Sequence, residues 1–164
     1  MSWTGYDPHR QALVNTGFFG AQGSGCLLLA RASGRVMLVL RSPSVQEPGT
    51  WGNLCGAHFE FESPEDGALH QLKDETRYSG PIELIPSLVF RSGSFVYRNF
   101  LGIIDDEFTP RLGWEATHFR WVTPGRWPQP LHFGIEALLA DEASREQLFS
   151  YSNAFKRKLA VGEV

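Results

Sequence analysis

The fold class of this chain is decided by residues 56–78, GAHFEFESPEDGALHQLKDETRY. Within this stretch Ser63 precedes Pro64, and two acidic residues follow. Serine suits the position before a helix, proline suits the first helical position, and acids there complement the helix dipole. Residues 79–81, Ser-Gly-Pro, then stop a helix. We therefore predict a loop followed by a helix that runs from Pro64 to about Tyr78.

The predicted helix has two faces with different expected roles. At about 100° per residue, one face carries Ala68, Leu69, Leu72 and Thr76, which we expect to pack on a sheet. A second face carries Gln71, Asp74, Glu75 and Tyr78, whereas His70, Lys73 and Arg77 point away from both. Oxygen-bearing side chains three and four residues apart can converge on one hard cation such as Mg²⁺ or Mn²⁺. The alternative is an acidic face that only contacts solvent.

The rest of the chain alternates between strand-like and helix-like segments. We predict strands at 26–31, 36–41, 57–61, 82–90, 95–104 and 118–122, and helices at about 131–141 and 144–159. The first two strands and the fourth and fifth form hairpins. This order predicts an α/β domain with a mixed sheet between helices. We expect one domain over residues 1–164, with residues 1–24 as an N-terminal arm.

Composition narrows the class of function. The chain has 164 residues and a net charge of -3, which gives no electrostatic case for a surface that coats nucleic acid. Its two cysteines, Cys26 and Cys55, fit small buried side chains rather than a zinc site or a disulfide framework. No apolar run reaches the roughly 18 residues of a membrane span, and the N-terminus has no apolar core of signal-peptide type. We expect a cytoplasmic protein.

The stretch at residues 56–78 resembles the box of the Nudix hydrolase family. That box is written as G, five residues, E, seven residues, then R-E-U-x-E-E-x-G-U, in which U is apolar. Four residues match it and one is a shortened acid: Gly56, Glu62, Leu72, Glu75 and then Asp74. Three depart from it, with His70 for arginine, Gln71 for the first glutamate and Arg77 for glycine. The resemblance extends to residues 48–52, 112–121 and 130–135.

The resemblance implies a Nudix fold and hydrolysis of a pyrophosphate in a nucleoside diphosphate linked to another moiety. It implies Mg²⁺ or Mn²⁺ as the cofactor, a nucleotide-type small molecule as the ligand, and a homodimer as an open possibility. The implied metal ligands are Gly56, Glu62, Asp74, Glu75 and Glu115. The implied catalytic residues are Gln71, Glu75 and Glu115.

The departures bear directly on catalysis. The Gln71 amide can offer an oxygen to a metal, but it cannot accept the proton of an attacking water. General-base help is typically worth about 10²- to 10⁴-fold, so this replacement predicts a slow enzyme. Glu60, Glu62, Glu115, His58 and His70 are other candidates for the base. The second interpretation is a protein that has kept the fold, lost turnover, and binds a nucleotide or a protein partner.

Aromatic and basic residues provide candidate substrate contacts. Trp51, Trp114, Trp121, Trp127, Tyr97 and Phe100 can stack on a nucleobase, although most of them are expected in the core. Trp51 is the exception that we assign to substrate binding, because it precedes the box in a loop rich in proline and glycine. Arg41 ends a predicted strand and is assigned to a phosphate contact.

Overall fold

The computed structural model describes residues 22–57, 62–93 and 95–160. Along the chain these form β1 (Gln22–Ala30), β2 (Val36–Arg41), β3 (Trp51–Gly52), β4 (Leu54–Ala57), α2 (Pro64–Thr76), β5 (Glu83–Ser92), β6 (Phe95–Ile104), β7 (Ala116–Val122), α3 (Phe133–Ala140) and α4 (Glu142–Ala160). Because β1 begins at Gln22, its first three residues do not belong to the predicted arm. The predicted strand at 57–61 is displaced to β4, and its residues 58–61 lie outside the described ranges.

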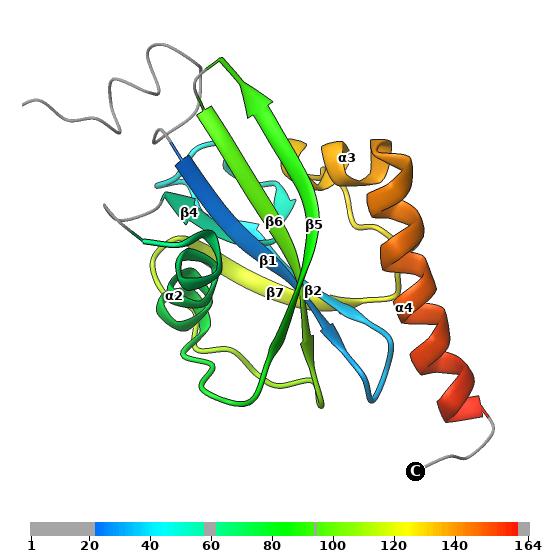
Figure 1. The fold of residues 1–164 in the computed structure, drawn as a ribbon. Coiled ribbons are helices and arrows are strands. Elements are labelled where there is room, and N and C mark those ends of the chain that lie inside the picture. Colours follow the sequence, from blue (N-terminus) through cyan, green and yellow to red (C-terminus); the bar gives the residue numbers. More distant parts are fainter. Residues whose placement is uncertain (1–21, 58–61, 94, 161–164) are drawn as a thin grey trace, which may run out of the picture.

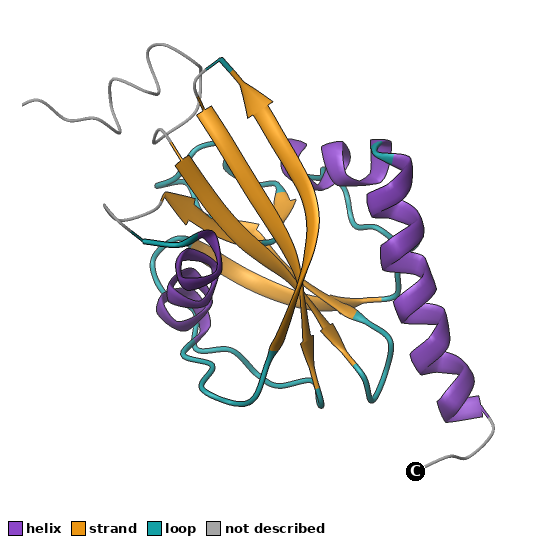
Figure 2. Ribbon diagram, viewed as in Figure 1, coloured by secondary structure: helices purple, strands orange, loops and turns teal. Residues whose placement is uncertain are grey.

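The strands form one mixed sheet. Its order is β3-β2-β1-β6-β5, with β4 paired to β1 and β7 paired to β2. Strands β1 and β6 run parallel, whereas the remaining pairs are antiparallel. Helix α2 covers one face, and α3 and α4 cover the other (Figures 1 and 2). The prediction of an α/β fold with a mixed sheet between helices is confirmed.

Strand β1 supplies side chains to both faces of the sheet. Cys26 and Leu28 pack in the cluster that contains Ala68 and Leu72 of α2. The residues between and beside them, such as Leu27, pack on the other face with residues of α3 and α4. Side chains alternate between the faces of a strand, so an unbroken apolar run marks a strand that is covered on both sides.

Helix α2 begins and ends as its sequence predicts. The Ser63 hydroxyl accepts a hydrogen bond from the Asp66 N–H at 3.1 Å, and Pro64 takes the first helical position. The helix ends at Thr76, and Arg77 follows in the left-handed conformation at φ 64° and ψ 17°. Its N–H donates to the Lys73 carbonyl at 2.9 Å. A left-handed conformation is costly for a residue with a Cβ, so the arginine occupies a backbone position suited to glycine.

The face of α2 predicted to pack on the sheet is correct for three of its four residues. Ala68, Leu72 and Thr76 are buried, but Leu69 is 37% exposed, so its predicted packing is wrong. Tyr78 does not share the acidic face either, because its ring packs against Phe108 with the centroids 4.8 Å apart.

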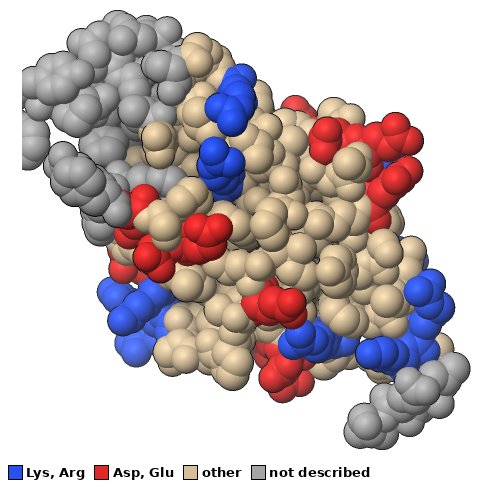
Figure 3. All heavy atoms as spheres, in the orientation of Figure 1, with Lys and Arg blue, Asp and Glu red and all other residues tan. Residues whose placement is uncertain are grey.

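Figure 3 shows where charged side chains gather on one face. Acidic groups lie over α2 and around α3 and the start of α4, basic groups lie near the C-terminal end of α4, and groups of both signs adjoin at the lower edge. In the described parts of the chain, every helix is too short or too polar to cross a membrane.

Candidate functional site

Two adjoining cavities open beside α2. The larger has a volume of about 590 Å³ and the smaller about 420 Å³. Five residues line both of them: Arg41, Asn53, Gln71, Trp114 and Glu115. A ligand can therefore extend from one cavity into the other.

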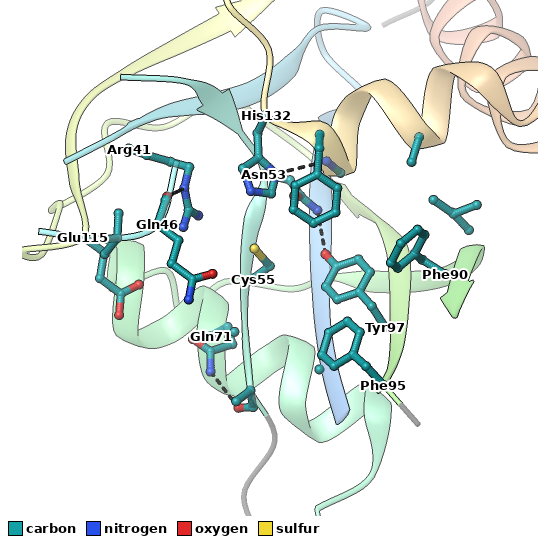
Figure 4. Close-up of a pocket in the computed structure, with 18 of the residues that line it drawn as sticks. Arg41, Gln46, Asn53, Cys55, Gln71, Phe90, Phe95, Tyr97, Glu115 and His132 are labelled. Atoms are coloured by element: carbon teal, nitrogen blue, oxygen red, sulfur yellow. Dashed lines mark hydrogen bonds between the residues drawn. The ribbon is translucent and has the colours of Figure 1, made fainter. Parts of the chain in front are cut away.

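The larger cavity has an aromatic wall. Phe90 comes from β5, Phe95 and Tyr97 come from β6, and Phe133 is the first residue of α3. The rings of Phe90 and Phe133 meet edge to face, with centroids 6.0 Å apart. Figure 4 shows Phe90, Phe95 and Tyr97 on one side of the cavity, across from Arg41, Gln46 and Glu115. Flat aromatic groups prefer such walls, because offset and edge-to-face contacts between rings add to apolar burial.

A buried polar network lies behind this wall. The Asn53 amide nitrogen donates to the Asn99 carbonyl oxygen at 2.6 Å and to the Tyr97 hydroxyl at 3.1 Å. The Tyr97 hydroxyl in turn donates to the same oxygen of Asn99 at 3.3 Å. Gly25 makes room for the network, because a Cβ there would lie 2.6 Å from the Tyr97 hydroxyl. The orientation of the Asn53 amide is therefore fixed.

The start of α3 is tied to the loop between β2 and β3. His132 Nδ1 accepts from the Gly134 N–H at 3.1 Å, so the neutral ring carries its proton on Nε2. That Nε2 lies 3.3 Å from a Glu47 carboxylate oxygen, which also accepts from the Phe133 N–H at 3.3 Å. Burial lowers the pKa of His132 to about 4, and the nearby charge of Arg41 acts in the same direction. The ring is neutral at pH 7 and helps to hold the loop against the larger cavity.

Two carboxyl groups meet in the smaller cavity. Glu75 of α2 and Glu115, which immediately precedes β7, both line this cavity and lie close enough to interact. Among the described residues, the buried Glu75 Oε2 has no hydrogen-bond partner. Burial raises the pKa of the Glu75 carboxyl well above its usual range, and the hydrogen bond and negative charge of Glu115 raise it further, whereas Arg41 acts in the opposite direction. Without a counter-charge, the raised pKa favours the protonated form of Glu75.

His70 joins two other acids of the stretch. Its Nε2 lies 2.7 Å from an Asp74 oxygen, and its Nδ1 lies 3.4 Å from a Glu62 oxygen. The prediction that His70 points away from the acidic face is therefore wrong. The Asp74 side chain is 57% exposed. Asp74 is thus bound to His70 at the rim of the smaller cavity rather than beside Glu75 at its centre.

Gln71 lies against the loop that begins at Gly56. Its amide nitrogen donates to the Ala57 carbonyl at 3.2 Å. A Cβ on Gly56 would lie 2.5 Å from the Gln71 amide, so the glycine permits this close approach. The contact holds the end of β4 on α2.

Known structures with the same architecture identify the fold. A Nudix hydrolase from M. smegmatis, RenU, is 20% identical over 90% of this chain and 91% of its own, with a TM-score of 0.63. A MutT NUDIX hydrolase from Burkholderia pseudomallei is 18% identical over 75% and 98%, with a TM-score of 0.59. The NUDIX domain of Shewanella oneidensis NrtR, solved with ADP ribose, is 23% identical over 85% and 97%, with a TM-score of 0.58.

The chain has the Nudix fold. A scan of protein-family models finds no match for this sequence, and a search of curated proteins finds none either. The relationship is thus carried by the arrangement of helices and strands rather than by overall sequence similarity.

Within the Nudix fold, the predicted metal-site residues fall into three places. Asp74, Glu75 and Glu115 line the smaller cavity, Gly56 lines the larger one, and Glu62 lies beside His70. Across residues 22–57, 62–93 and 95–160, no group of three His, Cys, Asp or Glu side chains is placed to hold a metal ion. The acidic members of this predicted set therefore separate into a Glu75–Glu115 pair and a Glu62–Asp74 pair joined by His70.

Glu75 and Glu115 nevertheless fit a divalent cation. An unpaired, buried carboxyl oxygen beside a second carboxyl is a donor set that Mg²⁺ and Mn²⁺ prefer. A cation there would also relieve the repulsion between the two groups when both are ionised.

Of the two residues predicted to contact substrate, Arg41 lies at the cavities and Trp51 does not. Arg41 lines both cavities, and its Nε donates to the Gln46 carbonyl at 2.6 Å. Trp51 is only 7% exposed, packs in the core and lines neither cavity. The guanidinium of Arg120 lies 5.0 Å from the centroid of its ring. This placement gives no support to stacking of a nucleobase on Trp51.

Several residues of the site were not predicted. Trp114 is 69% exposed and lines both cavities. No feature of the sequence distinguished it from the other tryptophans as a substrate contact. Phe90, Phe95, Phe133 and Asn53 also form the larger cavity. The three phenylalanines sit near the ends of predicted strands and helices, which is their only signal in the sequence, and Asn53 lies between two predicted strands without any signal. His58 and Glu60, two candidate bases, lie outside the described ranges.

Proposed function

We propose that this protein is a metal-dependent hydrolase that cleaves a pyrophosphate bond in a nucleoside diphosphate linked to another moiety, with weakened catalysis. The observation that supports it most strongly is the unpaired, buried oxygen of Glu75 beside Glu115. A buried carboxyl oxygen without a partner costs free energy. Its retention where two cavities meet is understandable if a cation completes it.

The two cavities suit different parts of such a ligand. The larger one accepts the flat base, and the smaller one accepts the diphosphate. Arg41 lies at their junction and supplies a guanidinium for phosphate oxygens. Glu75 and Glu115 would hold Mg²⁺ or Mn²⁺, which when bound neutralises phosphate charge and polarises phosphorus.

The weakened catalysis has a local cause. Gln71 cannot accept a proton from water, and its amide nitrogen is engaged by the Ala57 carbonyl. Glu115 is the remaining acid at the junction of the cavities and is our candidate for the base. Loss of a dedicated base lowers turnover by about 10²- to 10⁴-fold.

A second function is a binding module without turnover. The pairing of Asp74 with His70 at the rim of the cavity favours it, because this acid is then not directed at the centre of the site. The ADP ribose bound to the NUDIX domain of NrtR shows that a protein of this fold is found with such a ligand. In this alternative, the larger cavity and Arg41 bind a nucleotide that is not cleaved.

A hydrolysis panel separates the two functions. The substrates are ADP-ribose, dinucleoside polyphosphates and nucleotide sugars, each with Mg²⁺ or Mn²⁺, and release of a nucleoside monophosphate or phosphate is measured. The matched control is Glu75→Gln, which keeps the shape of the side chain and removes its charge. Slow turnover that this variant abolishes supports the hydrolase. Binding without turnover in both proteins supports the module. The cytoplasmic location and the homodimer stay predictions.

A further inference from the structure

The Asn53 amide is oriented so that its nitrogen has no hydrogen left for a ligand. One hydrogen goes to the Asn99 oxygen at 2.6 Å and the other to the Tyr97 hydroxyl at 3.1 Å. Figure 4 shows the second of these bonds, with Asn53 above Tyr97 in the wall of the larger cavity. The Asn53 amide nitrogen faces two oxygen acceptors, which leaves the amide oxygen on the side away from Asn99 and Tyr97.

The carbonyl oxygen of Asn53, in contrast to the nitrogen, is available to a ligand. Asn53 Oδ1 accepts no hydrogen bond from the described residues, and it is not fully buried. Asn53 is only 7% exposed, yet it lines both cavities. The small accessible part of this side chain therefore offers a hydrogen-bond acceptor to the cavities.

The polar groups next to Asn53 in this wall are engaged, and the donors of Arg41, Gln46 and Gln71 lie elsewhere around the cavity. The Tyr97 hydroxyl donates to Asn99, and His132 Nε2 lies 3.3 Å from a Glu47 carboxylate oxygen. Phe90 and Phe95, which complete the wall, have no polar atoms in their side chains. A ligand carbonyl placed here would lose its bonds to water without replacement, which costs about 1–3 kcal/mol.

The positive charge of Arg41 further restricts the class of ligand that the larger cavity can bind. Arg41 lines the same cavity, so a cationic ammonium group would meet a positive charge. A neutral ring with an attached amine avoids both penalties, since it supplies an N–H donor and adds no charge. The aromatic side chains around it suit a flat ring.

We infer that the larger cavity selects an amino-substituted nucleobase of the adenine or cytosine type, with the amine donating to Asn53 Oδ1. This inference rests on the proposed function, because it names the base of the same nucleotide ligand. Tyr97 and Asn99 act as positioning residues, since they hold the Asn53 amide in the orientation that presents its oxygen. Uracil is disfavoured, because carbonyls flank its ring N–H and would face a wall without free donors.

Binding of matched ligands tests the selection without any turnover. Dissociation constants are measured by calorimetry with Mn²⁺ for adenosine 5′-(α,β-methylene)diphosphate and for its purine riboside counterpart, which lacks only the amine. The cytidine and uridine methylene diphosphates form the second pair. We expect the amine-bearing ligand of each pair to bind about tenfold tighter or more, because a site built around a hydrogen bond rejects the analogue that lacks it.

Variants of Asn53 show whether this residue is the cause. Asn53→Ala should reduce the preference to about twofold or less. The ligand pairs on the unaltered protein decide the matter even if Asn53→Ala does not fold.

The outcomes separate this inference from the proposed function. Equal affinity within both pairs overturns the selection by Asn53 and leaves the hydrolase proposal intact. A preference that survives unchanged in a folded Asn53→Ala protein also overturns it. If none of the four nucleotides binds, the assignment of a nucleotide ligand fails, and this inference fails with it.

Discussion

The larger and smaller cavities share five lining residues but differ in how their polar groups are paired. In the larger cavity, Asn53 and His132 have fixed orientations and satisfied donors. In the smaller cavity, Glu75 has an unpaired oxygen, and Asp74 is bound to His70 at the rim. The ligand-binding half of the site is thus complete from the chain alone. The half that would perform the chemistry needs a further group.

This difference suggests that binding and catalysis can be changed separately. A substitution in the smaller cavity should change turnover or metal affinity and leave recognition of the base intact. A substitution in the aromatic wall should do the reverse.

The largest effect is expected at Gln71. Gln71→Glu supplies a group that can accept a proton, so turnover should rise by about 10²- to 10⁴-fold if the Glu75–Glu115 pair holds a metal. The measurement is kcat for the best substrate of the panel. Gln71→Met, which also loses the bond to the Ala57 carbonyl but adds no base, is the matched control and should not gain activity. Unchanged kcat in a folded Gln71→Glu protein would place the base elsewhere.

The next effect concerns the aromatic wall. Phe90→Ala should weaken nucleotide binding by roughly 10- to 100-fold, because stacking of a base on an aromatic side chain is worth about 1–3 kcal/mol. Its affinity for Mn²⁺ should not change. Val89→Ala is the control, since Val89 is exposed on the same strand and lines neither cavity. Equal losses in the two variants would show that β5 contributes only stability.

The third effect is a dependence of stability on pH. The pKa of Glu75 is raised in the folded protein, chiefly by burial, so the folded state holds a proton that the unfolded state releases. Stability without metal should therefore fall as pH rises from the ordinary range of a glutamate through the raised pKa. Glu75→Gln should flatten this fall. Urea midpoints at pH 5 and pH 8 measure it, with exposed Glu136→Gln as control. A fall of the same size in Glu75→Gln would assign it to other groups.

The smallest effect lies at the end of α2, where Arg77 lines the smaller cavity. Arg77→Gly should stabilise the protein by about 1 kcal/mol, because glycine adopts the left-handed conformation without the penalty of a Cβ. The melting temperature should rise by about 2–4 °C for a chain of this size. Arg77→Ala removes the same side chain but keeps the Cβ, so it should bring no such gain. Equal stability of the two variants would show that the backbone conformation is not the cause.

Local signals predicted α2 and the strands well, because Ser63, Pro64 and the apolar runs act through their own neighbours. The placement of His70 was wrong for an identifiable reason. The prediction overlooked that, at about 100° per residue, positions four apart differ by only about 40°, so His70 and Asp74 lie on one face and their side chains can reach each other. An arginine at position 70 and a glutamate at position 74 would also lie side by side, because the spacing of four residues is the same.

The aromatic cavity could not be predicted from the sequence. Phe90 and Phe133 are distant along the chain and meet only because β5 and the start of α3 are brought together in the fold. The burial of Trp51 likewise depends on a distant segment, since the backbone N–H of Trp51 donates to the Pro130 carbonyl at 2.9 Å. The sequence pattern places neither pair of segments in contact.

Titration of Mn²⁺ followed by heat tests most directly whether Glu75 and Glu115 complete the smaller cavity with a metal. The protein should show one saturable site at pH 8, and Glu75→Gln should lose it while binding of nucleotide to the larger cavity persists. No heat from the unaltered protein, or equal heat from both proteins, would contradict a metal centre at this pair of acids.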